Sequence, residues 1–311
     1  MAPYTADQLE TYLERISYPA FGDTRVQNVQ VHKEADPLGT LSELQRRHLC
    51  SIPWGNSGLH YTQHHTISIH PQVIYDKLIH RKLDGYCMEN SNLFYLILQS
   101  LGYQVYATGG RVSHAVATGR NDGLFLAIGH MILIVTIGNE KYMVDVGFGN
   151  NCATRPIPLK ENIIVPHIAP SESRLVKESL LEFTDKTQKI WIYQTRYNPE
   201  SEWMANICFS EVEFLPQDFG VMNFSVSRNP ASWFTQTFVC MKMIMSEDEK
   251  EIEGQCVMSG REVKRRVCGK SEVVEKLESE EDRVRALGKW FGMHLREDEV
   301  QGIRGMASMI K

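Results

Sequence analysis

Position 87 carries a cysteine with the features of a reactive thiol. Cys87 follows Asp84-Gly85-Tyr86 and opens an apolar run with helical spacing that extends to Leu101. A thiol at a helix N-terminus faces unpaired N–H groups and the positive end of the helix dipole, which favour the thiolate. The preceding glycine lets the backbone turn there. These features predict a nucleophile; the alternative is a small buried core residue, which is what most cysteines are.

Partners for this thiol lie between His130 and Asp145, a segment typical of two strands joined by a turn at Gly138-Asn139. Residues equidistant from such a turn face each other, so a two-residue turn puts Ile132 opposite Asp145. His130 is then a diagonal neighbour of Asp145 on the same face. A carboxylate beside a histidine fixes its tautomer and stabilises the imidazolium, so Cys87, His130 and Asp145 are a candidate catalytic triad. The alternative is a solvated hairpin end with an incidental polar pair.

A glycine-rich turn, Gly147-Phe148-Gly149, follows the aspartate. Two glycines around one aromatic residue allow a close backbone approach to a ligand, with Phe148 as a lid; an ordinary turn is the alternative. No phosphate-binding glycine fingerprint occurs. Five histidines crowd the stretch from His60 to His80 without paired metal-ligand spacing, so no metal site is expected. Arg261 and Lys264-Arg265-Arg266 are expected to form a solvated strand face, with attraction for ligand phosphates as a second interpretation.

The elements that must position these residues divide the chain into three parts. Residues 1–102 are mainly helical, with a capping box at Thr5-Ala6-Asp7-Gln8, a helix at Leu41–Leu49 and a third helix from Cys87 to Leu101. Residues 103–215 are rich in β-branched and aromatic runs, and several short strands without a long helix suggest a barrel or meander. The predicted strands are Tyr103–Thr108, Met131–Ile137, Lys141–Val146 and Ile190–Tyr193, and Pro156–Ser173 is predicted to be loop.

Residues 216–311 have a mixed pattern. We predict strands at Phe234–Met245 and Gln255–Val267, and helices at Ser279–Phe291 and Glu297–Ile303. Ser279 is a suitable N-cap, and the acidic residues that follow it suit the first turn of a helix.

Composition limits the classes of protein that the sequence can encode. The 311 residues are 42% hydrophobic and 23% charged, which is typical of a globular chain and too apolar for a disordered one. The net charge of −5 argues against a dedicated nucleic-acid or anionic-membrane binder. No run reaches the roughly 20 apolar residues that span a bilayer, and the N-terminal MAPYTADQLETYLERISY lacks the pattern of a signal or transit peptide. The seven cysteines, without a CxxC pair, are expected to be reduced thiols in the cytosol.

Together these motifs resemble the arylamine N-acetyltransferase family over most of the chain, and more narrowly a fungal-type or prokaryotic-like member. The family shows Arg-Gly-Gly-x-Cys with Glu and Asn following, and the string here is Leu83-Asp84-Gly85-Tyr86-Cys87-Met88-Glu89-Asn90. Leu83 and Asp84 replace the Arg and the first Gly, and Arg81 is the candidate substitute for the missing cation.

Further segments carry the same resemblance. Pro53-Trp54-Gly55-Asn56 is similar to the family's Pro-Phe-Glu-Asn with two changes, and Gly110-Arg111-Val112 is similar to the motif before the catalytic histidine. The best match runs from His130 to Gly149. In the C-terminal part the similar residues are Asp218-Phe219, Met222-Asn223, Pro230 and Ser232 to Phe234.

The resemblance implies an α+β fold: an N-terminal helical bundle, a central β-barrel and a C-terminal α/β lid, around a core like that of cysteine proteases and transglutaminases. By this resemblance, the family's catalytic triad corresponds to Cys87, His130 and Asp145. It also implies ping-pong acyl transfer from an acyl-CoA to an aromatic amine or hydrazine, with a detoxifying role. Acetyl-CoA is the default donor, and propionyl- or malonyl-CoA are alternatives. The residues expected to line the acceptor pocket are Val112 and Phe148, and those expected to contact CoA are Gly149, Ser225, Ser232 and Phe234.

The expected partners are therefore a CoA thioester and the amine, with no permanently bound cofactor, no nucleic acid and no membrane. A monomer in the cytosol is the working expectation. Arg228 is a candidate cation for the carboxylate of a malonyl group, with a surface role as its alternative. Two other functions stay open on the residues alone: a thiol hydrolase or transglutaminase-like enzyme that uses the same triad, and a binding homologue without activity.

Overall fold

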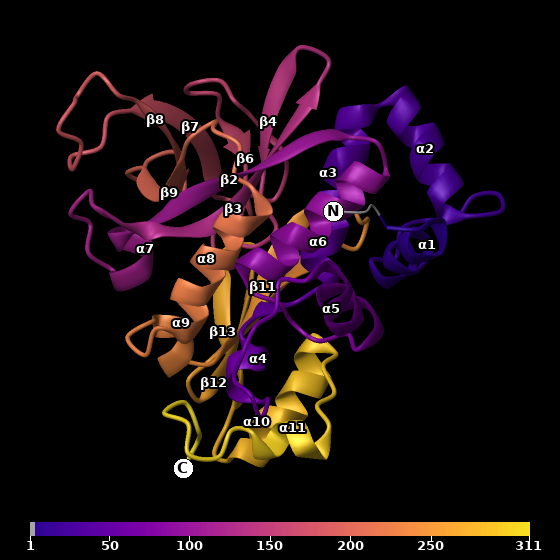
Figure 1. The fold of residues 1–311 in the computed structure, drawn as a ribbon, viewed down its shortest axis with the longest axis vertical. Coiled ribbons are helices and arrows are strands. Elements are labelled where there is room, and N and C mark those ends of the chain that lie inside the picture. Colours follow the sequence, from indigo (N-terminus) through magenta and orange to yellow (C-terminus); the bar gives the residue numbers. More distant parts are fainter. Residues whose placement is uncertain (1–3) are drawn as a thin grey trace.

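The structure is a computed structural model that describes residues 4–311 (Figure 1). Residues 1–3, the start of the N-terminal segment predicted to lack a targeting peptide, lie outside the described residues. Up to Ser100 the chain is mainly helical, as predicted. Its elements are α1 (Ala6–Arg15), α2 (Arg25–Ala35), α3 (Pro37–Ser51), β1 (Trp54–Gly55), α4 (Ser57–His60), α5 (Pro71–Tyr75), the π-helix η1 (Asp76–His80) and α6 (Cys87–Ser100).

The predicted helix starts are confirmed where a cap and an apolar face coincide. In α1, Thr5 accepts a hydrogen bond from the N–H of Gln8, and the buried face is Leu9, Tyr12 and Leu13. α3 begins earlier than the predicted Leu41 because Asp36 caps it through the N–H of Gly39 (2.9 Å). α2 was not predicted, since Asn28 and Val29 are its only fully buried residues and give it little apolar periodicity.

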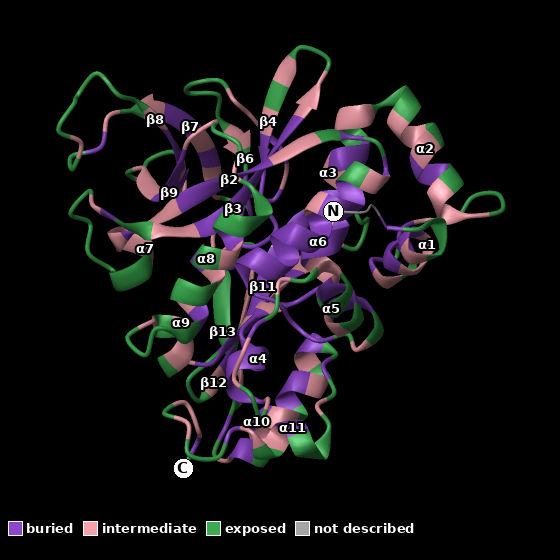
Figure 2. Cartoon of the chain, in the orientation of Figure 1, coloured by how far each residue is buried: buried purple, intermediate pink, exposed green. Residues whose placement is uncertain are grey.

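Helix α6 runs through the interior, and Figure 2 shows it buried over most of its length. Its middle is attached to the neighbouring sheet, because Ser91 Oγ donates a hydrogen bond to the carbonyl oxygen of Met131 (3.1 Å). The largest apolar core cluster includes side chains of both α6 and this sheet, such as Phe94 and Ile134. The helix that begins with Cys87 is therefore held rigidly against the strands.

The central part forms an eight-stranded antiparallel sheet with the order β5-β4-β3-β2-β9-β8-β7-β6. Since β5 also contacts β7, the sheet curls into a nearly closed barrel. A short helix, α7 (His114–Thr118), joins β2 to β3. The strands are β2 (Gln104–Ser113), β3 (Phe125–Ile137), β4 (Glu140–Val144), β5 (Ile157–Pro158), β6 (Val165–Pro166), β7 (Glu172–Glu178), β8 (Ile190–Arg196) and β9 (Met204–Phe209).

The four predicted strands of this part are present, while β7 and β9 were missed. The predicted loop at Pro156–Ser173 contains the two-residue strands β5 and β6 and the start of β7. Strand β4 ends at Val144, earlier than predicted, because Asp145 turns out of the ladder and its Oδ1 accepts a hydrogen bond from the N–H of Gly147 (2.7 Å).

The last part contains a second antiparallel sheet, with the order β1-β10-β11-β12-β13. Its elements are α8 (Pro216–Arg228), α9 (Trp233–Gln236), β10 (Val239–Met245), β11 (Ile252–Ser259), β12 (Glu262–Val267), β13 (Lys270–Lys276), α10 (Glu280–Ala286), the π-helix η2 (Leu287–Phe291) and α11 (Glu297–Gln301). The predicted helices near Ser279 and Glu297 are confirmed, and Ser279 is the N-cap.

Both predicted strands of this part need correction. Phe234–Met245 is not one strand, because residues 233–236 form a helical turn before β10 starts at Val239. Gln255–Val267 is two strands, because a turn at Gly260, with φ +59°, reverses the chain between β11 and β12.

Two elements connect the parts. Strand β1, from the helical part, pairs with β10, so Trp54 lies opposite Met241. Helix α8, which follows the barrel in sequence, packs on β3. The division at residues 102 and 215 remains a prediction. Among residues 4–311, no helix is both long and apolar enough to cross a membrane, and no group of three or more His, Cys, Asp or Glu side chains is arranged to hold a metal ion. All seven cysteines are free thiols.

Candidate active site

Cys87 is the first residue of α6, and the cap of that helix fixes its position. The backbone N–H of Tyr86 donates a hydrogen bond to Glu89 Oε2 (3.1 Å). Cys87 is 4% exposed, and its Sγ lies 3.8 Å from the carbonyl oxygen of Gly129. The first N–H groups of a helix have no helical acceptor, so the cysteine lies beside unpaired donors and the positive end of the dipole.

His130 and Asp145 meet at the end of the β3–β4 hairpin. Leu133 pairs with Val144, and continuing this register places Ile132 opposite Asp145, as a two-residue turn predicts. Nε2 of His130 lies 2.7 Å from Oδ2 of Asp145. Both side chains are almost fully buried, with 3% and 0% of their surfaces exposed.

Asp145 controls the charge of His130. Burial alone would lower the pKa of His130, but the charge of Asp145 and the hydrogen bond to it raise that pKa to about 10. The imidazole is therefore protonated at neutral pH. Cys87 also contributes to the raised pKa of His130, and since Asp145 occupies Nε2, Nδ1 is the ring nitrogen left for the sulfur. An imidazolium beside the sulfur stabilises a thiolate.

Asp145 is itself held from several sides. Its Oδ1 accepts a hydrogen bond from the N–H of Gly147, so both carboxylate oxygens are engaged. Its carbonyl oxygen accepts a hydrogen bond from Gln45 Nε2 (3.0 Å), and the same nitrogen also donates to the carbonyl oxygen of Ala153 (2.8 Å). The buried Gln45 of α3 thus connects the helical part to the aspartate.

The two glycines after Asp145 approach other parts of the protein closely. A Cβ on Gly147 would lie 2.7 Å from the Cα and the carbonyl oxygen of Cys87. A Cβ on Gly149, where φ is +77°, would lie 2.9 Å from the Trp54 indole. The space left by the missing side chains at these two positions is filled by Cys87 and Trp54, and the expected approach of this turn to a ligand remains a proposal.

Two of the predicted aromatic residues lie beside His130 or beside Tyr86, which precedes Cys87. The Phe148 ring stands edge-on to the His130 ring, with centroids 5.3 Å apart. The Phe234 ring contacts Tyr86 at 5.7 Å and Trp54 at 5.9 Å, again edge-on.

Within residues 4–311, no side-chain hydrogen bond or ring contact joins the other predicted residues to Cys87, His130 or Asp145. Val112 is half-buried on β2 and pairs with Ile207 of β9. Ser225 lies exposed on α8, whereas Ser232 is partly buried and precedes α9. Gly149 is buried under Trp54. The acceptor and CoA contacts of these residues remain proposals.

Comparison with known proteins decides the family. The sequence profile of a family described as N-acetyltransferase matches residues 37–300. The chain belongs to the arylamine N-acetyltransferase family. It is similar to an N-malonyltransferase of Gibberella moniliformis, with 34% identity over 95% of this chain and 91% of that protein. An N-malonyltransferase of Fusarium pseudograminearum is 32% identical over 96% and 92%. Arylamine N-acetyltransferase 2 of Mus musculus is 26% identical over 75% and 76%.

Solved arylamine N-acetyltransferase structures share the fold. The enzyme from Mycobacterium abscessus superposes with a TM-score of 0.77 at 22% identity, over 97% of this chain and 98% of the other. The Mycobacterium marinum enzyme in complex with CoA gives a TM-score of 0.76 at 25% identity, over 96% and 99%. The predicted α+β class with helical bundle, barrel and lid is thus confirmed. The family uses a CoA thioester as co-substrate, and the protein is an acyl-CoA-dependent N-acyltransferase.

At Leu83 and Asp84 this chain departs from the arylamine N-acetyltransferase motif, so the motif arginine is missing. The cation of the ion pair at the start of α6 comes from an unexpected residue. Lys77 Nζ lies 2.7 Å from Glu89 Oε1. The suggestion that Arg81 supplies this charge is wrong, because both terminal nitrogens of Arg81 bind the carboxylate of Glu299 (2.9 Å each). Lys77 lies in the π-helix η1, where no motif marks it.

Two asparagines that join residues 216–239 to the helical part were also missed. Asn56 Nδ2 donates to the carbonyl oxygens of Phe234 and Thr237 (2.8 Å each), and its Oδ1 accepts from the N–H of Val239 (3.0 Å). Asn223 of α8 accepts a hydrogen bond from the Tyr86 hydroxyl. Both asparagines stand in motifs quoted for the resemblance, which was the available signal.

Proposed function

We propose that the protein acylates aromatic amines by a ping-pong reaction in which Cys87 carries the acyl group. The observation that supports this is the buried 2.7 Å bond between His130 and Asp145, which raises the pKa of His130, a rise to which Cys87 also contributes. A thiolate stabilised before substrate binds is an activated nucleophile.

In the first half-reaction the Cys87 thiolate attacks the thioester carbonyl of the acyl-CoA and forms a new carbon–sulfur bond. The developing oxyanion lies at the start of α6, where backbone N–H groups lack helical acceptors and stabilise it. The bond to the CoA sulfur then breaks, and the departing thiolate takes the proton from His130. Acyl-Cys87 and a neutral His130 remain.

In the second half-reaction the amine nitrogen attacks the acyl-Cys87 carbonyl. His130 takes the proton that the nitrogen loses, and Asp145 stabilises the imidazolium that forms again. The Cys87 thiolate leaves, and the amide is released. The Phe148 ring beside His130 offers the acceptor an aromatic surface at the point of proton transfer.

Malonyl-CoA is the proposed donor in place of the acetyl-CoA default. The support is that the two fungal relatives at 34% and 32% identity, matched over nearly the whole chain, are N-malonyltransferases. Arg228, which ends α8 and is exposed, remains the candidate cation for the malonyl carboxylate. The proposal includes detoxification of aromatic amines in the reducing cytosol, where Cys87 stays a free thiol.

Intact-mass measurement tests the mechanism and the donor together. The purified protein is mixed separately with acetyl-, propionyl- and malonyl-CoA, without amine. The expected result is a gain of one malonyl group, larger in yield than with the other donors and absent in Cys87→Ala. Equal gain from acetyl-CoA overturns the donor assignment. No gain from any donor, in a protein whose Cys87 is readily alkylated, overturns the covalent mechanism.

A further inference from the structure

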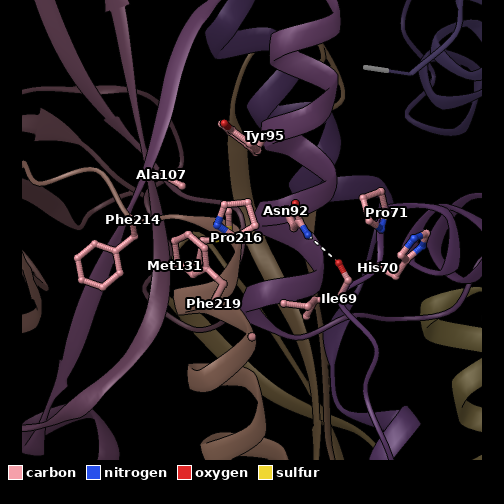
Figure 3. A pocket seen from close by; sticks show the side chains of 11 residues that line it. Ile69, His70, Pro71, Asn92, Tyr95, Ala107, Met131, Phe214, Pro216 and Phe219 are labelled. Atoms are coloured by element: carbon pink, nitrogen blue, oxygen red, sulfur yellow. Dashed lines mark hydrogen bonds between the residues drawn. The ribbon is translucent and has the colours of Figure 1, made fainter. Parts of the chain in front are cut away.

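A cavity of about 370 Å³ lies between α6, α8, strands β2 and β3 and the loop around Ile69 (Figure 3). Cys87, His130 and Asp145 do not line it, and neither do Val112, Phe148 or Phe234. Its wall includes Met131, which follows His130 directly. Since neighbouring side chains of a strand point to opposite faces, the cavity and the catalytic histidine lie on opposite sides of β3.

The cavity contains a polar side chain with unused hydrogen-bonding capacity. Asn92 is 5% exposed, and its Nδ2 donates to the carbonyl oxygen of Ile69 (2.9 Å), as the dashed line in Figure 3 shows. Its Oδ1 accepts no hydrogen bond from any residue in 4–311. Although the residue is largely buried, Oδ1 is not among the fully buried unpaired side-chain atoms, so it is accessible and can accept a hydrogen bond from a ligand that carries a donor.

The remaining walls are suited to a flat apolar ring. Phe214 and Phe219 contribute rings whose centroids are 6.1 Å apart, and Met131 and Ile69 add aliphatic surface. Of the described residues that line the cavity, none is Asp, Glu, Lys or Arg, and besides Asn92 its polar side chains are His70 and Tyr95, so an uncharged ligand suits it better than an ionic one. The volume is near the lower end of small-molecule sites, which fits one or two fused rings.

We propose that this cavity is a binding site for an uncharged aromatic molecule of one or two rings that donates an N–H or O–H group to Asn92 Oδ1. The site is separate from the acyl-transfer centre, and the proposal does not depend on the reaction assigned there. Because Asn92 shares α6 with Cys87, and Met131 shares β3 with His130, the bound molecule contacts the two elements that carry the nucleophile and its base.

Gly220 of α8 provides a way to fill the site. It lines the cavity, and a Cβ built on it meets nothing within 4 Å, so a larger side chain enters free space. Replacing a helical glycine also favours the helix. Gly220→Leu is therefore the blocking variant. Gln217→Leu, exposed on the same helix and outside the cavity, is the matched control.

The probe is 6-fluoroindole, titrated into the full-length protein and followed by fluorine NMR, with its N-methyl derivative as a probe that lacks the donor. We expect saturable binding by the wild type and by Gln217→Leu, with affinity at least about tenfold weaker in Gly220→Leu. The N-methyl derivative should bind roughly five- to tenfold more weakly than 6-fluoroindole, which is the range of one hydrogen bond. Binding should persist after Cys87 is alkylated.

Three results would overturn the proposal. The first is no binding by the wild type up to the solubility limit of the probe. The second is equal affinity in wild type and Gly220→Leu. The third is loss of binding on alkylation of Cys87, which would place the probe in the catalytic cleft.

Discussion

Gly147 packs directly on the backbone of Cys87, so closely that a Cβ at position 147 would lie 2.7 Å from the cysteine Cα. This contact places the Asp145 turn beside the start of α6 and so joins the helical part to the barrel at the nucleophile. The arrangement of Cys87, His130 and Asp145 therefore depends on a residue that carries no reactive group.

Gly147→Ala should lower acyl transfer about 100-fold, because a displacement on the order of 1 Å at a reacting group has an effect of that size. The measurement is kcat/KM with a fixed donor and amine. Gly220→Ala, at a helical glycine with open space around it, is the control and should keep wild-type activity. Wild-type activity in Gly147→Ala would show that the packing at this contact is not needed.

Asp145→Asn should slow alkylation of Cys87 at neutral pH. Without the carboxylate, the pKa of His130 falls and the imidazolium that stabilises the thiolate is lost. In the wild type, the His130 imidazolium persists up to about pH 10, so the rate of reaction with iodoacetamide should exceed that of Asp145→Asn throughout the range from about pH 7 to pH 9. In Asp145→Asn the rate should be at least about tenfold lower at pH 7 and rise steadily with pH.

The alkylation measurement needs a background in which only Cys87 reacts. Cys268 is exposed, so Cys268→Ser is introduced into both proteins, and the modified peptide is identified by mass. Identical pH profiles for the two proteins would contradict the role assigned to Asp145.

Local sequence was enough to predict that His130 and Asp145 lie together and that Cys87 begins a helix. The register of the His130–Asp145 hairpin follows from one short turn, and the start of α6 follows from the glycine and the apolar spacing around Cys87. These depend on residues within about one turn or one hairpin of each other, where periodicity is informative. The capping box of α1 was readable for the same reason.

Contacts between distant segments could not be predicted from pattern. Asn56 and Phe234 are 178 positions apart, and nothing near Phe234 signals that its carbonyl is held and its segment wound into a helical turn. Strand β9 lies between β2 and β8 because of barrel closure, which local propensity does not encode. Lys77, and not Arg81, pairs with Glu89 because Lys77 lies in the π-helix η1, which places it beside that carboxylate.

The His130–Asp145 pair should make stability depend on pH on the alkaline side. The folded pKa of His130, about 10, lies above the roughly 6.5 of an unfolded histidine. Its stabilising contribution is therefore fully present below about pH 6.5 and is lost as the pH rises through about 10. The free energy of unfolding in urea, measured from about pH 6 to pH 10, should show the gap between wild type and Asp145→Asn narrowing with pH. A difference in unfolding free energy between the two proteins that stays constant with pH would contradict this assignment.

Lys77→Met should destabilise the protein by about 3 kcal/mol near pH 7, because it leaves a buried carboxylate on Glu89 without its counter-ion. Burial already raises the pKa of Glu89 while Lys77 opposes that rise, so the variant's Glu89 titrates higher still. A group whose folded pKa is raised costs stability as pH rises through that pKa. The loss should thus be smaller at about pH 5 than at pH 8 in urea unfolding.

Two further variants separate this charge effect from simple loss of packing. Lys77→Met with Glu89→Gln should recover most of the stability, since the amide removes the buried charge and keeps an acceptor for the N–H of Tyr86. Arg81→Met, at a pair whose arginine is 32% exposed, should cost only about 1 kcal/mol or less. A loss in Lys77→Met that does not change with pH and is not recovered by Glu89→Gln would show that the lysine acts through packing. The cation that replaces the missing motif arginine would then have no electrostatic role at the nucleophile helix.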